Sequence, residues 1–473
     1  MDLKRYGKYS YSLVHEGRFL KTLFRFAVVI LVAIQLFGPF FPFPSQIPLF
    51  VSALVIFVAG FPLMSRGFRV AALLFLILAF SLLGFSRQPF ATWVAATNSM
   101  TNIIAIVAVM QTFSMPIRLG TYDSAIRAWV EGRFKSLRSL FAFTTLVTHL
   151  LTSFLNLGSV PVVVSLFGKA LGRRVENYER FISSAATRGY VLAALWSPGA
   201  VNLFLVVQAT GLSWSRVFLP GFFLAIIGMG LSSLFEFGKG GVHESKEVGS
   251  ETPSKGLAQS ARAFHVFFVA LAFVLLMLLF ELLDIGAPGS RMILAGASIS
   301  LVWLLSLAGR PGLAVELRAY WREGLLKTAD IGPFFVAMGL FSGALEHSGA
   351  MDRAAPFLEA AASALGGGSV VLVGLLIVAG SLIGLHPFIT IVLFGKILAH
   401  SDLPVPPLTV AMGLAVGGAA AYMVTPFAGV IMTLSKLIGA RAFDVAFRWN
   451  WRFGILFFGT GMAFAFLWGG FFG

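Results

Sequence analysis

Two long apolar stretches of the sequence are interrupted near their middle by residues that could bind an ion or a carboxylate. The first interruption reads Asn156-Leu157-Gly158-Ser159-Val160-Pro161, and the second reads Gly384-Leu385-His386-Pro387. Asparagine offers a carbonyl that could bind Na⁺ and an amide that could bind a carboxylate, and it could also cap a broken helix. The unperturbed pKa of an imidazole lies near neutrality, so His386 could carry a coupling proton, donate to an anion, or only satisfy a free carbonyl.

Two later apolar stretches carry a hydroxyl residue followed by proline at corresponding places, Ser197-Pro198 and Thr425-Pro426. Proline removes a backbone hydrogen bond and interrupts a helix, so we expect a broken helix at each pair. Asn202 follows the first pair and has the same three roles open to it as Asn156. Four hydroxyl groups near the interruptions could be ligands or helix caps, those of Ser159, Ser197, Thr390 and Thr425.

The elements that carry these residues must cross a membrane. Of the 473 residues, 58% are hydrophobic and only 12% are charged, about half the charged fraction of a soluble protein. The lack of cysteine excludes disulfides, thiolate catalysis and cysteine-bound metals, and the sequence contains no phosphate-binding loop. We predict an all-α polytopic membrane protein with about 11 transmembrane helices and two re-entrant hairpins, at 139–171 and 368–399. The expected transmembrane helices are 23–41, 47–64, 69–86, 92–113, 189–212, 216–236, 264–283, 291–308, 328–346, 407–438 and 450–471.

The distribution of basic residues predicts the orientation. The formal net charge is +15, and 30 of the 35 Lys and Arg residues fall on one side of the membrane if the N-terminus is cytosolic. By the positive-inside rule this favours a plasma (inner) membrane protein with its N-terminus in the cytosol and its C-terminus outside. The lipid bilayer then explains the positive charge, and no nucleic-acid partner is expected.

The two halves of the sequence repeat the same pattern. A shift of 228 residues places Ser197-Pro198 on Thr425-Pro426, a shift of 226 places Pro161 on Pro387, and the amphipathic stretch 121–137 corresponds to 349–365. An odd number of crossings separates equivalent points, so the second repeat is inverted. The expected organisation is an N-terminal arm and extra first helix (1–46), repeat 1 (47–236), a cytosolic linker loop (237–263) and repeat 2 (264–473), with broken helices at about 181–212 and 407–440.

Inverted repeats with discontinuous helices at corresponding places are typical of secondary transporters. The arrangement resembles the ion transporter superfamily, which includes divalent-anion/sodium symporters and the large membrane subunit of TRAP transporters. The run from Ser197 to Phe204 is similar to the Pro-containing, Asn-Leu-Phe-ending run of the TRAP subunits. The resemblance covers about 47–472, mostly as architecture. It implies an elevator-type carrier of a small carboxylate, coupled to Na⁺ or H⁺, and a homodimer.

The resemblance also implies where ions and substrate bind. The first site would comprise Asn156, Gly158, Ser159, Ser197 and Asn202, and the second Ser381, Gly384, His386, Thr390 and Thr425, with Pro198, Pro387 and Pro426 beside them. Na⁺ at Ser159, Ser197 and Thr425 is the one cofactor that it suggests. The chain departs from the divalent-anion branch, because neither tip carries the Ser-Asn-Thr signature of that branch and the second has His386-Pro387 instead.

Three other functions stay open, although we expect a transporter and not an enzyme. A TRAP-like permease would need a soluble binding protein, which the sequence allows but does not require. An intramembrane enzyme or flippase for lipid-linked substrates would use His386 and Glu346, and a channel would conduct without coupling. Arg188 lies about two to three turns before Ser197 and could counter a substrate carboxylate, but snorkelling to the inner interface is the simpler expectation.

Overall fold

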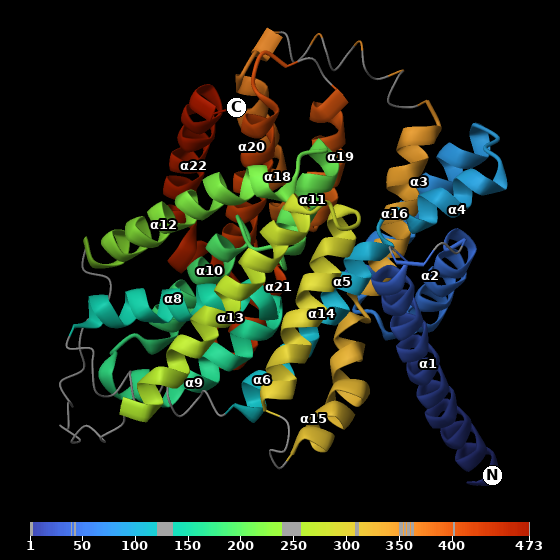
Figure 1. The fold of residues 1–473 in the computed structure, drawn as a ribbon, viewed down its shortest axis with the longest axis horizontal. Helices are drawn as coiled ribbons and strands as arrows, with labels where there is room; N and C mark the ends of the chain where they lie inside the picture. Colours follow the sequence, from blue (N-terminus) through green and yellow to red (C-terminus); the bar gives the residue numbers. More distant parts are fainter. Residues whose placement is uncertain are drawn as a thin grey trace. The chain divides into compact units, whose positions relative to one another are not determined.

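The structure, a computed structural model, describes residues 3–38, 40–41, 44–120, 136–238, 257–307, 312–349, 353, 356, 360, 364–400 and 403–472. Every regular element among these residues is a helix (Figure 1). Ten helical stretches of the described chain are long and apolar enough to cross a membrane, and three shorter apolar helices accompany them. The predicted all-α polytopic membrane fold is therefore confirmed.

The first half of the chain contains the first hairpin, α8 and α9, and the first broken helix, α10 and α11. Its helices are α1 Leu3–Phe37, α2 Gln46–Gly60, α3 Arg66–Phe85, α4 Phe90–Asn98, α5 Thr101–Thr112, α6 Ser114–Leu119, α8 Leu137–Leu155, α9 Ser159–Arg174, α10 Tyr178–Ala193, α11 Val201–Thr210 and α12 Trp214–Gly238. Helix α1 contains both the residues of the predicted N-terminal arm and the first span.

The second half contains the second hairpin, α18 and α19, and the second broken helix, α20 and α21. Its helices are α13 Leu257–Leu282, α14 Pro288–Ser306, α15 Leu313–Ala319, α16 Ile331–His347, α18 Gly368–Leu382, α19 Pro387–His400, α20 Pro407–Val424, α21 Gly429–Ile438 and α22 Trp451–Phe472. π-Helical turns at Tyr320–Gly324 and Asp444–Asn450 precede α16 and α22. Most of the predicted amphipathic stretches, 121–137 and 349–365, and of the linker 237–263 lies outside the described residues.

Two predicted spans differ from the observed helices. The span 92–113 is broken into α4 and α5 at Ser99–Met100, where the Ser99 hydroxyl donates a hydrogen bond to the Gly339 carbonyl at 3.0 Å. No proline or glycine marks this break, so the apolar pattern continues through it. The span 189–212 starts earlier, at Tyr178, because its polar first turn is helical and carries Glu179 near the positive end of the helix dipole.

The helices pack into two compact units, and each unit is built from both halves of the sequence. Unit 1 comprises Met1–Met115 and Asp284–Ala354, and unit 2 comprises Pro116–Leu283 and Ala355–Gly473. Both hairpins and both broken helices belong to unit 2. The linear division that the sequence predicts therefore describes the repeats and not the compact units.

In unit 1, α16 packs against α2, α3 and α4. A Cβ atom added to Gly343 would lie 2.5 Å from Ala96 Cα, so α16 and α4 touch through their backbones. The rings of Phe75 on α3 and Phe341 on α16 stack with centroids 5.2 Å apart. Close backbone approach and ring packing are what hold helices together in lipid, where the hydrophobic effect does not drive helix–helix association.

In unit 2, α20 is buried along its whole length and packs against α18 and α22 (Figure 1). A Cβ atom added to Gly417 would lie 2.9 Å from Gly374 Cα. The backbones of α20 and α18 are therefore in direct contact, and a side chain at Gly417 would separate them. The first arm of the second hairpin is consequently fixed against the central helix of its own unit.

Corresponding points in the two halves lie 228 residues apart. Asn156 and Gly384 turn the two hairpin tips with positive φ angles of 49° and 99°. Gly211 and Gly439 end the two broken helices in the left-handed region, with φ angles of 69° and 73°. Among the described residues between the hairpins, α12, α14 and α15–α16 are long and apolar enough to cross a membrane, and α11 and α13 contain the shorter apolar helices Val201–Thr210 and Phe267–Leu282. An inverted repeat requires an odd number of crossings between the hairpins, and five such stretches agree with that requirement.

The predicted offset of 226 at the hairpin tips is wrong. Helix α9 starts at Ser159 and α19 starts at Pro387, so Ser159 and Pro387 are equivalent. Pro161 lies two residues inside α9 and therefore has no proline counterpart. Proline is accepted in the first turn of a helix, where its missing N–H has no intrahelical partner, so two such prolines need not be equivalent.

Arg188 does not snorkel, contrary to the expectation from its position. Its side chain is fully buried in unit 2, and its Nη2 atom lies 2.9 Å from Oε2 of Glu236, which is also fully buried. The guanidinium lies 4.5 Å from the ring centroid of Phe453 and donates to Asn450 Oδ1 at 3.1 Å. The residue therefore joins α10, α12 and the start of α22.

We predict that Glu236→Gln lowers the stability of the protein by about 3 kcal/mol or more, because it leaves the buried charge of Arg188 without its counter-ion. Thermal unfolding of the detergent-solubilised protein measures this. The double variant Arg188→Met/Glu236→Leu should unfold at a higher temperature than Glu236→Gln, since an apolar pair needs no desolvated charge. A double variant less stable than Glu236→Gln would show that the pair does not act as a unit.

Candidate functional site

The first hairpin tip gathers oxygen atoms in a buried place. The chain turns through a 3₁₀ turn at Asn156–Gly158, and Asn156 adopts the positive φ that asparagine tolerates better than most residues. The buried Ser159 hydroxyl lies 2.7 Å from the Asn156 carbonyl oxygen and 2.8 Å from the Thr152 hydroxyl. Three neutral oxygen atoms therefore meet at this tip, and neutral oxygens are ligands that suit Na⁺.

The second hairpin tip is different in chemistry. Gly384 turns the chain, and Pro387 stands where the first tip has Ser159, so this tip has no equivalent hydroxyl. The Thr390 hydroxyl donates to the Pro387 carbonyl at 3.0 Å and so serves its own helix. His386 Nδ1 accepts a hydrogen bond from the backbone two residues later at 3.3 Å. The predicted second cation site does not assemble as the first does.

Each broken helix is tied to its own hairpin by the hydroxyl that precedes its proline. Ser197 Oγ donates to the Ser153 carbonyl at 2.6 Å, and Thr425 Oγ1 donates to the Ser381 carbonyl at 2.7 Å. Each hydroxyl also accepts from the backbone N–H two residues later, at 3.2 and 3.3 Å. The ties satisfy backbone groups that the breaks at Pro198 and Pro426 leave open, which a membrane interior requires.

The half-helices that follow the breaks pack against the hairpin of the other repeat. Helix α11 packs against α19, and α21 packs against α9. Gly429, the first residue of α21, lies beside Leu157 in the first tip, where an added Cβ atom would be 3.4 Å from the leucine side chain. Each hairpin is thus hydrogen-bonded to the broken helix of its own repeat and packs against a half-helix of the other repeat.

Two buried tyrosines connect the hairpin tips. The Tyr190 hydroxyl donates to Asn156 Oδ1 at 2.7 Å. The ring of Tyr190 lies 6.4 Å from that of Tyr422, which lies 5.9 Å from the His386 ring. The sequence does not point to these tyrosines, because they do not occupy corresponding positions in the two repeats.

Asn202 is the one candidate whose buried side chain has no hydrogen-bond partner among the described residues. It is 3% exposed, and both its Oδ1 and its Nδ2 lack a partner. A Cβ atom added to Gly418 on α20 would lie 2.5 Å from Asn202 Oδ1 and 2.7 Å from the Ile391 side chain. Glycine at 418 therefore provides the space for this amide. A buried amide without partners costs free energy, about 1–3 kcal/mol, which a bound ligand would recover.

Four half-helices begin in this region. Helices α9 and α19 start at the tips, and α11 and α21 start after the breaks, with lengths of 16, 14, 10 and 10 residues. Helix N-termini carry partial positive charge and unpaired N–H groups, which favour anions. The segments 156–161, 197–202, 384–390 and 425–430 contain no Lys, Arg, Asp or Glu. The described residues also contain no group of three His, Asp or Glu side chains that could hold a metal ion.

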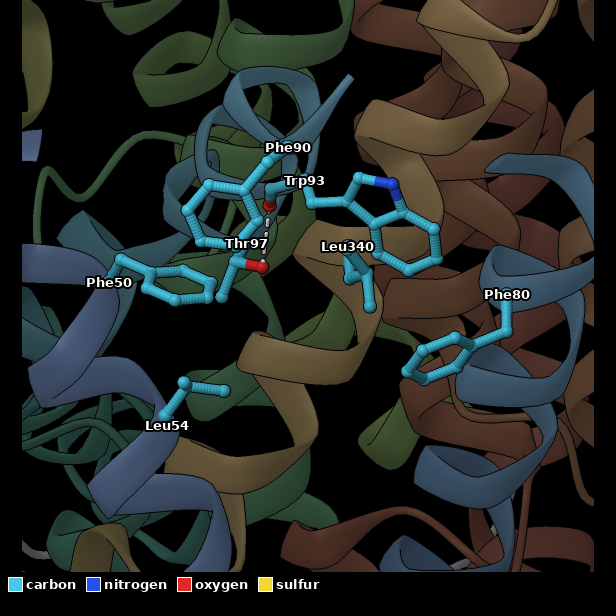
Figure 2. A pocket seen from close by; sticks show the side chains of 7 residues that line it. All are labelled: Phe50, Leu54, Phe80, Phe90, Trp93, Thr97 and Leu340. Carbon is cyan, nitrogen blue, oxygen red and sulfur yellow. Dashed lines mark hydrogen bonds between the residues drawn. The ribbon is translucent and has the colours of Figure 1, made fainter. Parts of the chain in front are cut away.

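A separate cavity in unit 1 is unsuited to an anion. It has a volume of about 400 Å³ and is lined by aromatic and aliphatic side chains (Figure 2). Its single lining hydroxyl, Thr97 Oγ1, donates to the Trp93 carbonyl at 2.8 Å (Figure 2). None of the lining residues is charged, so nothing in this cavity could hold a carboxylate.

The chain is thus a polytopic membrane protein in which two hairpins and two broken helices meet in one compact unit. The solved structure of the YdaH transporter of Alcanivorax borkumensis is similar, with a TM-score of 0.57 and 15% sequence identity. The match covers 85% of this chain and 98% of that protein. The similarity establishes a shared fold with a transporter. No protein-family profile and no curated protein sequence matches the chain.

We predict that the hydroxyl ties are structural. Thr425→Val removes the bond to the Ser381 carbonyl without a large change in volume, so it should cost about 1–3 kcal/mol of stability. Thr425→Ser keeps the hydroxyl and should cost less. Ser197→Ala should behave like Thr425→Val, because it breaks the equivalent bond. Thermal unfolding of the three variants tests this, and equal stability of Thr425→Val and Thr425→Ser would contradict it.

Proposed function

We propose that this protein is a secondary active transporter that moves a small organic anion of the carboxylate class across the membrane by an elevator mechanism. Its transport would be coupled to Na⁺ or H⁺. The observation that carries the proposal is the buried, unpartnered amide of Asn202 beside the start of α11. An amide and a helix N-terminus together offer N–H donors to a carboxylate without burying a full positive charge.

The inverted repeat supports the transport class. Transporters built from such repeats bind their substrate where the repeats meet, at discontinuous helices. Here α11 of repeat 1 packs against α19 and α20 of repeat 2, and Asn202 lies at that junction. The shared fold with the YdaH transporter agrees with this class.

The first hairpin tip is the better candidate for a coupling cation. Its Ser159 hydroxyl, Thr152 hydroxyl and Asn156 carbonyl converge, whereas the second tip has Pro387 in place of the serine. Na⁺ would bind these neutral oxygens without a carboxylate. His386 at the second tip is the alternative carrier of a coupling proton.

The compact units support the elevator part of the proposal. Both hairpins and both broken helices lie in unit 2, while unit 1 contains other spans from both repeats. Unit 2 would carry the site across the membrane and unit 1 would form the fixed scaffold and the contacts of a homodimer. We further propose an inner-membrane orientation with a cytosolic N-terminus and an external C-terminus, following the positive-inside rule.

We predict that Asn202→Val abolishes substrate binding without unfolding the protein. Valine is the residue at the equivalent position of repeat 2, Val430, and it removes an unpartnered buried amide, so the ligand-free variant should be at least as stable as the wild type. A ligand that binds the native state raises its unfolding temperature. We expect one of succinate, citrate, lactate or glutamate to stabilise the wild type but not this variant.

Gln208→Leu is the matched control, because it removes an amide from the far end of the same helix α11. Uptake of the stabilising carboxylate into proteoliposomes should survive in the control and be lost in Asn202→Val. Uptake by the purified protein alone would exclude a need for a soluble binding protein. Normal uptake by Asn202→Val would disprove the assigned role of Asn202.

We predict that Na⁺, compared with choline, raises the unfolding temperature of the wild type and that Ser159→Ala removes this effect. The serine contributes one of the converging oxygens, and its loss should weaken Na⁺ binding about tenfold or more. The same measurement at several pH values tests the alternative, coupling to protons. A carboxylate effect that depends on pH, is indifferent to Na⁺ and disappears in His386→Ala would replace sodium coupling by proton coupling.

A further inference from the structure

Unit 2 contains a cavity of about 960 Å³ that lies away from both hairpin tips. Its walls come from the start of α10, the end of α12 and the π-helical turn that leads into α22. Three arginines line it, Arg180, Arg448 and Arg452, against a single carboxylate, Glu179. The lining therefore carries a net positive charge of two, which favours an anionic ligand.

The wall of this cavity is fixed by buried contacts. Arg180 Nε donates to Glu236 Oε1 at 3.0 Å, and Glu236 is held in turn by the buried Arg188. The π-helical turn leaves the Trp449 carbonyl available, and Arg188 Nη2 donates to it at 3.3 Å. The arginines thus lie on helical elements, Arg180 on α10, Arg448 in the π-helical turn and Arg452 on α22, and not on a loop.

The cavity also has the composition of a membrane–water boundary. The apolar span of α12 ends at Phe237, and the span that includes α22 begins at Asp444, so the lining residues lie at the ends of both spans. Trp449 and Trp451 line the cavity, and the Arg452 guanidinium lies 5.5 Å from the ring centroid of Trp451. Tryptophan collects at the level of the lipid headgroups. Leu234, which is 55% exposed, adds an apolar wall toward the membrane side.

We propose that this cavity binds the phosphate group of an anionic phospholipid, with the headgroup among the three arginines and an acyl chain along Leu234 and Phe235. Guanidinium groups bind phosphate oxygens through paired N–H donors, and basic pockets between transmembrane helices are suited to anionic headgroups. A free phosphate offers the same chemistry to the arginines. The tryptophans and the exposed leucine favour the lipid, because an inorganic anion has no apolar group that could pack against these side chains.

The test uses the full-length protein in detergent with a short-chain phosphatidylglycerol, and with the phosphatidylcholine of the same chain length as the neutral comparison. We expect phosphatidylglycerol to raise the unfolding temperature more than phosphatidylcholine. Removing two of the charges in Arg448→Gln/Arg452→Gln should weaken the apparent phosphatidylglycerol affinity by roughly tenfold to thirtyfold.

The control Arg216→Gln/Arg441→Gln removes the same net charge from positions outside the cavity and should keep the wild-type affinity. Inorganic phosphate alone is the third arm. If it stabilises the wild type as strongly as the lipid and this effect is lost in Arg448→Gln/Arg452→Gln, the site is a phosphate site and the lipid assignment is overturned. Equal effects of the two lipids, or equal losses in both double variants, would overturn the site itself.

Discussion

The structure depends on one constraint, which is that a backbone interrupted inside a membrane must still have its polar groups hydrogen-bonded. The two ties, Ser197 to Ser153 and Thr425 to Ser381, meet this constraint for both broken helices with the same geometry. Each needs only one hydroxyl, because that oxygen donates to a carbonyl of the hairpin and accepts from an N–H beyond the proline. The hairpins and the broken helices are therefore one connected element in each repeat.

Two such elements of opposite orientation create a region in which helices begin and no charged side chain occurs. The segments 156–161, 197–202, 384–390 and 425–430 of this region carry helix N-termini and hydroxyl groups but no Lys, Arg, Asp or Glu. The repeats are nevertheless unequal. Repeat 1 supplies Ser159 and Asn202, whereas repeat 2 has Pro387 and Val430 at the same places. A duplicated framework thus carries different polar groups at its two corresponding places.

Much of this could be predicted from the sequence. Apolar runs predicted the rough bounds of most spans, about 11 of them where the described residues contain ten long apolar helices, and the prolines and glycines located both tips and both breaks. The break between α4 and α5 could not be found, because Ser99 closes it with a hydrogen bond to a residue 240 positions away. Arg188 was misplaced for a similar reason. Its counter-ion Glu236 lies on another helix, and a single sequence does not show that the two meet. The contact between Tyr190 and Tyr422 could not be predicted, because repeat symmetry does not relate the two residues.

The interleaving of the two units bears on how the protein can be made. Helix α3 buries Ala72, Phe75 and Ala79 in unit 1, and its main packing partner α16 begins only at Ile331. During synthesis, which proceeds from the N-terminus, the first hairpin and its broken helix are completed after the first 115 residues and before the rest of unit 1. Unit 1 cannot close before residues 284–354 have been inserted. The early helices can pack against one another, as α1 does against α2, but the face of α3 that contacts α16 must stay exposed to lipid until α16 is inserted, so the order of assembly is not the order of the chain.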